Sequence, residues 1–136
     1  MTSAEMEDSA FLAAFESATL PESGFRHRDH VRAAWLLLRA GSPAEALGRF
    51  SEALKRFAAA LGKARLYHET ITWAYLLLIN ERMERSGRGA DWEDFAESNP
   101  DLLTWRPSIL DAYYREETLQ SDLARAVFVL PDRISP

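Results

Sequence analysis

The sequence predicts an all-α fold, a compact helical bundle of about five to seven helices that forms a single domain over residues 1–136. Apolar residues recur at spacings of three and four in several segments, as they do on the buried face of a helix. No alternating run of β-branched residues is long enough to form a strand. Hydrophobic residues make up 47% of the 136 positions and charged residues 27%, so the chain can bury a core without cross-links.

Three central helices are expected near 26–40, 43–61 and 67–85. The middle one has the clearest start, because Ser42 is a capping residue, Pro43 suits the first helical position and Glu45 completes a capping box. Gly41 and Gly62 follow the first and second helices, where glycine commonly ends a helix.

Shorter helices are expected on either side of the central three. An amphipathic helix is predicted at about 5–18, followed by a break that includes Ser23-Gly24. Beyond a loose linker at 86–89, short helices are predicted near 91–99, 107–114 and 121–128. These helices are expected to cover the core formed by the central ones.

Charge and cysteine content restrict the partners that we expect. A net charge of -5 and a pI near 5.2 argue against nucleic acid or an anionic membrane as the main partner. Because the chain has no cysteine, any metal must be held by His, Asp or Glu. Residues 1–8 are acidic and lack the features of a signal peptide, and no apolar run approaches membrane-spanning length. We therefore expect a cytoplasmic protein.

The candidate site comes from two stretches that begin with polar residues and continue as apolar helices, 25–38 and 67–79. Together they contain all three histidines of the chain. Short connections favour up-down-up packing of the central helices, which makes the first and third of them parallel. Their N-terminal ends then meet, and His27 and His30 are expected to lie close to His68 and Glu69.

Three histidines and a carboxylate can form the first coordination shell of a divalent metal ion. We expect His27, His30 and His68 as ligands, with Glu69 as the fourth ligand or as a general base. Zinc, iron, nickel and manganese are not distinguished by these residues. If the site is catalytic, an open coordination position would activate water or dioxygen on a small substrate.

Two other interpretations remain open. The positive ends of two helices favour an anion, and Arg28, Arg32, Arg65 and the Tyr67 hydroxyl could bind a small anionic ligand. The protein would then be a non-catalytic small-anion-binding or protein-interaction module, and a homodimer is compatible with it. In the third interpretation the histidines are structural: the first two lie at the start of a helix, His68 has its hydrogen bonds satisfied in the core, and the arginines are solvated.

The stretches Phe25-Arg26-His27-Arg28-Asp29-His30 and Tyr67-His68-Glu69-Thr70, with Tyr113-Tyr114 and the tail around Ser121, resemble a family of small, uncharacterised all-helical bacterial proteins. The likeness spans most of the chain. It implies a helical fold and no particular reaction, and it adds Ser121 and Arg125 as candidate ligand-binding residues. DinB-like and hemerythrin-like bundles also hold metals with histidines from several helices, but their late His-x-x-x-His elements are missing from this sequence.

Overall fold

The computed structural model describes residues 2–21 and 25–133, and this part of the chain is helical without any strand. The predicted break at Ser23-Gly24 lies outside it. The α-helices are α1 (Asp8–Glu16), α2 (His27–Ala40), α3 (Pro43–Ala60), α4 (Glu69–Ser86), α5 (Trp92–Ser98), α6 (Pro100–Leu103), α7 (Glu116–Leu119) and α8 (Asp122–Ala126). Among the helices so described, none is both long and apolar enough to cross a membrane. The predicted all-α fold is confirmed.

The start of α3 is fixed by the local chemistry that the sequence predicts. The Ser42 Oγ accepts a hydrogen bond from the Glu45 backbone N–H at 3.2 Å, and the Glu45 Oε1 accepts one from the Ser42 N–H at 3.2 Å. Pro43 occupies the first helical position, where its missing N–H has no intrahelical partner to lose. The capping box is therefore confirmed, and it sets the direction in which α3 leaves α2.

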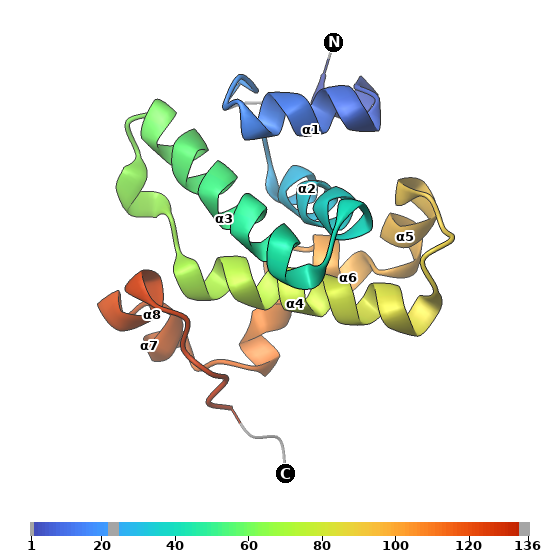
Figure 1. Ribbon diagram of the computed structural model, residues 1–136. Coiled ribbons are helices and arrows are strands. Elements are labelled where there is room, and N and C mark those ends of the chain that lie inside the picture. The colour runs from blue at the N-terminus through green and yellow to red at the C-terminus, as the bar shows by residue number, and fades with distance from the viewer. Residues whose placement is uncertain (1, 22–24, 134–136) are drawn as a thin grey trace.

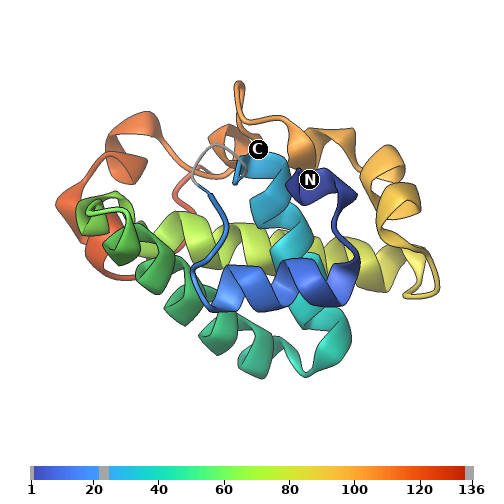
Figure 2. The ribbon, with the colours of Figure 1, turned by 90° about the horizontal axis from the view of Figure 1, so that it is seen from above.

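The arrangement of the central helices differs from the predicted one. Figures 1 and 2 show α2 crossing α4, whereas parallel packing of the two was predicted. The reason is that α2 is buried on all sides, from Val31 through Leu38, and contacts α1, α3, α4 and α6. A helix that is apolar all round takes a position in the centre of a fold and not one in a side-by-side layer. The prediction of parallel helices was wrong.

The C-terminal segment is attached to the first turns of α4 by a few specific contacts. The Thr70 Oγ1 donates a hydrogen bond to the Val127 carbonyl at 2.8 Å and accepts one from the Val129 N–H at 3.0 Å. The rings of Trp73 and Phe128 stack with their centroids 5.0 Å apart. These contacts hold α7 and α8 beside the N-terminal end of α4 (Figure 1).

Candidate functional site

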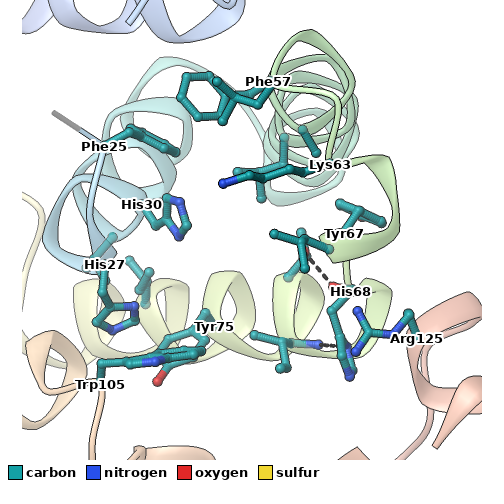
Figure 3. Close-up of a pocket in the computed structure, with 18 of the residues that line it drawn as sticks. Phe25, His27, His30, Phe57, Lys63, Tyr67, His68, Tyr75, Trp105 and Arg125 are labelled. Atoms are coloured by element: carbon teal, nitrogen blue, oxygen red, sulfur yellow. Dashed lines mark hydrogen bonds between the residues drawn. The ribbon is translucent and has the colours of Figure 1, made fainter. Parts of the chain in front are cut away.

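A cavity of about 680 Å³ lies between α2, α3 and α4, and the segments around residues 61–67 and 105–106 complete its walls. Figure 3 shows its residues converging from these elements. Most of the wall is apolar, and Phe25, Leu54, Phe57, Ile71 and Ile79 contribute to it. The cavity also has polar lining residues, namely His27, His30, Lys63, Tyr67, His68, Thr72, Tyr75, Arg106 and Arg125.

His27 lies in the first turn of α2 and is held against the floor of the cavity. Its Nε2–H donates to the Leu102 carbonyl at 2.8 Å. Its ring meets Tyr75 edge-on at 4.9 Å and Trp105 at 5.0 Å between centroids. Burial lowers the pKa of His27, and the Leu102 carbonyl partly opposes that shift. The ring is therefore neutral at pH 7, and its Nε2 is occupied.

His30 lies one turn further along α2 and is the least constrained of the three histidines. Its ring packs on Phe25 with 4.3 Å between centroids. Within residues 2–21 and 25–133, its ring nitrogens make no hydrogen bond. Burial, and to a smaller extent the electrostatic effect of the neighbouring His27, lowers the pKa of His30 to about 4. A neutral imidazole has one donor and one acceptor, so His30 can give both to a ligand.

The lowered pKa of His30 predicts how stability depends on pH. The unfolded chain binds a proton at His30 below about pH 6.5, whereas the folded chain binds it only near pH 4. The contribution of the neutral ring to the free energy of unfolding is therefore complete above pH 6.5 and is lost as the pH falls towards 4. We expect His30→Leu to lose less stability than the wild type between pH 7 and pH 5 in urea denaturation. Parallel losses in the two proteins would contradict this assignment.

His68 has a structural role that occupies both of its ring nitrogens. It is the N-cap residue of α4, where its Nδ1 accepts the Ile71 backbone N–H at 3.1 Å. Its Nε2–H donates to the Leu119 carbonyl at 2.7 Å. A metal ion could bind this ring only if one of these two hydrogen bonds broke. The arrangement matches the structural interpretation of His68.

The three histidines do not converge on one point. His27 contacts Tyr75, in the middle of α4, whereas His68 precedes the first turn of that helix. At 1.5 Å of rise per residue, this separation is about 10 Å along the helix axis, and Figure 3 shows the two rings at opposite ends of the cavity. No group of three His, Asp or Glu side chains suited to a metal occurs within the described ranges. A divalent metal at this site stays a prediction.

Glu69, predicted as a metal ligand or a general base, begins α4 beside the cavity but is not among the residues that line it. Its Oε1 accepts a hydrogen bond from the Tyr67 hydroxyl at 2.5 Å. Burial and this hydrogen bond raise the pKa of Tyr67. Tyr67 does line the cavity, as a neutral phenol whose proton is already donated.

Two of the arginines predicted to bind an anion have other partners. Arg28 is exposed, lies over the Trp92 ring and pairs with Glu93 at 3.4 Å. Arg32 is buried and donates to carbonyl oxygens of the N-terminal segment and to the Asp8 carboxylate at 2.9 Å. Neither side chain lines the cavity. Arg32 is directed to these acceptors and not to the cavity, because a buried guanidinium needs oxygen atoms close by.

Of the two candidate residues near the C-terminus, Ser121 and Arg125, only Arg125 lines the cavity. The Ser121 Oγ caps α8 by accepting the Ala124 N–H at 3.1 Å and donates to the Thr118 carbonyl at 2.6 Å. Arg125, which follows on α8, lines the cavity and donates to the Arg65 carbonyl at 2.9 Å. The Arg65 side chain does not line it. Ser121 therefore positions α8, and Arg125 is the residue of the tail that reaches the site.

The cavity residues that were not predicted from the sequence include Lys63, Trp105 and Arg106. They lie in connections between helices, where no periodic pattern relates a residue to a buried face. The Trp105 side chain is 46% exposed and covers His27 at the edge of the cavity. An exposed tryptophan in a loop is the one sequence feature that could have suggested a binding surface here.

No protein-family model, curated protein or solved structure matches this chain.

Proposed function

We propose that the protein binds a small, largely apolar organic molecule, held non-covalently in the cavity between α2, α3 and α4. The cavity itself is the observation that carries this proposal. Its volume of about 680 Å³ falls inside the range of roughly 300 to 1,000 Å³ that is typical of small-molecule sites. Packing defects in protein interiors are rarely larger than a water molecule.

The chemistry of the wall supports recognition of an apolar body with few polar groups. The Phe25 and Phe57 rings lie 4.7 Å apart between centroids and form one side of the cavity, and Tyr75 and Trp105 contribute to another. Most of the polar groups are already engaged, because the Tyr75 hydroxyl is hydrogen-bonded to Ser108 at 2.9 Å and that of Tyr67 to Glu69. Among the histidines and tyrosines of the cavity, His30 is the one best placed to bind a polar atom of the ligand.

Binding without catalysis is favoured by the protonation states of the cavity residues. Burial lowers the pKa of His27, His30 and His68, and burial raises the pKa of Tyr67 and Tyr75. All five side chains are therefore uncharged at neutral pH. An acid or base poised for proton transfer needs a pKa close to the working pH, and burial moves these groups away from it.

A divalent-metal site, with or without metal-dependent catalysis, is the expectation from the sequence and is the competing proposal. His27 and His30 are one turn apart on α2, a spacing at which two histidines can share an ion. The further ligands that such a site needs are not supplied by His68 in its hydrogen-bonded state. Metal analysis of protein purified without an affinity tag would decide, since a stoichiometric metal that is lost in His30→Ala would favour the metal site. The expected cytoplasmic location also stays a prediction.

The binding proposal is tested by filling the cavity. Ala58 lines it from α3, whereas its neighbour Ala59 is exposed and does not line it. We expect Ala58→Trp to weaken the binding of octanol at least about tenfold, because the indole occupies the space of the ligand. Ala59→Trp adds the same side chain outside the cavity and should leave the affinity unchanged.

Isothermal titration calorimetry measures both affinities without interference from the added tryptophan. Melting temperatures of the two variants show that each is folded. If octanol binds equally well to both variants, the cavity is not the binding site and the proposal fails.

A further inference from the structure

We infer that the molecule bound in this cavity carries a carboxylate or a similar anionic headgroup, which Arg106 and Arg125 hold where the cavity adjoins a second one. This inference rests on the proposed binding function and adds the chemical class of the ligand.

The first supporting observation is the sign of the charges that line the cavity. Lys63, Arg106 and Arg125 line it, and no Asp or Glu is among its described lining residues. The chain as a whole has 21 acidic residues against 16 Lys and Arg. A wall whose described residues include three cations and no carboxylate is the opposite of that overall balance. Charges of one sign around an apolar cleft attract a ligand of the other sign.

The second observation is the position of the two arginines. Arg106 and Arg125, together with His68, Ile71 and Trp105, also line an adjoining cavity of about 490 Å³. The two cavities therefore share a boundary that includes both arginines. Asp111 and Glu116 line the adjoining cavity, which therefore has charges of both signs. Among the described residues, the charged side chains that line the larger cavity are all cations. A headgroup at the boundary can reach water while its apolar body stays inside.

The hydrogen-bonding capacity of the arginines is largely unused. The Arg125 Nη1 donates to the Arg65 carbonyl at 2.9 Å, which leaves its other N–H groups. Neither Arg106 nor Arg125 forms an ion pair with a carboxylate of the described residues. A guanidinium presents paired N–H groups that match the two oxygens of a carboxylate. Both arginines are thus available for a ligand anion.

The ligand can be placed along the cavity from these features. Figure 3 shows Arg125 beside His68 at one end and Phe25, His27 and His30 at the other. An apolar body extending from Arg125 would pass Ile71 and Thr72 and end against Phe25 and Phe57. A medium-chain or aromatic carboxylate has this shape, with one charged end and a length of apolar surface.

The test compares three probes that share one alkyl chain: octanoate, octanol and octylammonium. Calorimetric titration at low salt is expected to give octanoate a Kd about tenfold lower than that of octanol, since charge-assisted hydrogen bonds exceed neutral ones in strength. Octylammonium is expected to bind most weakly. Added salt should weaken the binding of octanoate and leave that of octanol unchanged.

Variants then assign the preference to residues. In Arg106→Gln and Arg125→Gln, the advantage of octanoate over octanol is expected to fall several-fold, and in the double variant it should vanish. Octanol binding should persist in all three, which also shows that each is folded around its cavity. The control is Arg85→Gln, which removes an equal charge from an exposed side chain near the end of α4 that pairs with Glu81.

The outcomes separate the two proposals. Equal affinities for octanoate and octanol, both sensitive to Ala58→Trp, would overturn the anionic headgroup and leave the binding function standing. A preference for octanoate that survives the double arginine variant would also overturn the inference. If neither probe binds in a way that depends on Ala58, the proposed function fails as well.

Discussion

Replacing His68 with alanine is expected to lower the free energy of unfolding by about 1.5 to 5 kcal/mol. The loss of an N-cap hydrogen bond costs about 0.5 to 2 kcal/mol, and α4 loses the bond between Nδ1 and the Ile71 N–H. The Leu119 carbonyl also loses its donor, and an unsatisfied polar group adds about 1 to 3 kcal/mol. Urea denaturation at pH 7 measures the sum.

His30→Ala is the matched control for this prediction. His30 is also a neutral histidine of the cavity, but its ring nitrogens bond to no described residue. Its removal should cost less than about 1 kcal/mol, as for a side chain that bridges no structural elements. Equal destabilisation by the two substitutions would mean that the cap and the link to α7 do not hold this end of α4.

Arg32→Met is expected to lower the free energy of unfolding by about 2 to 4 kcal/mol, because hydrogen bonds to a charged group contribute about 1.5 to 3 kcal/mol each. Its guanidinium donates to Ser3 O at 3.0 Å, Met6 O at 2.7 Å and Asp8 Oδ1 at 2.9 Å. It also lies over the Phe11 ring at 4.3 Å. Methionine keeps much of the volume but none of these donors, and the buried Nε, which has no partner in the described residues, offsets part of the loss.

The control here is Arg28→Met, one turn earlier on α2. The Arg28 side chain is 48% exposed and its contact with Glu93 is 3.4 Å long, so its removal should cost at most about 1 kcal/mol. Limited proteolysis gives a second readout, because only Arg32→Met should expose the segment around Ser3 and Met6 to cleavage. Similar stability and similar cleavage of both variants would show that Arg32 does not anchor the N-terminal segment.

The helices were predictable because their signals are local. The capping box at Ser42 and the apolar spacing of α2 and α3 depend on residues within a few positions of each other. The crossing of α2 over α4 was not predictable in this way, because it is decided by packing between distant segments. α7 was missed because a four-residue helix is too short for a periodic pattern.

All three histidines line the cavity, but the position of His68 just before α4 was not predicted, because that helix was expected to begin two residues earlier. α4 was predicted to begin near Tyr67, which would place the His68 ring on a helical face. The helix begins at Glu69, and His68 precedes it with extended backbone at φ -133 and ψ 110. That shift of two residues turns an expected ligand into a cap. Lys63 and Arg106, which supply much of the cavity's charge, lie in connections whose positions only the tertiary structure fixes.

The attachment of the C-terminal segment to Thr70 links the occupancy of the cavity to local unfolding. Arg125 lies on α8, and the chain that follows is held to α4 through the Thr70 hydroxyl. When this segment detaches, the cavity loses one of its charged walls, so a ligand that contacts Arg125 binds the closed state in preference to the open one. Mass action then raises the free energy of opening as the ligand concentration rises. The amide hydrogen of Val129 is donated to Thr70, so its exchange with solvent should become slower as the free energy of opening rises.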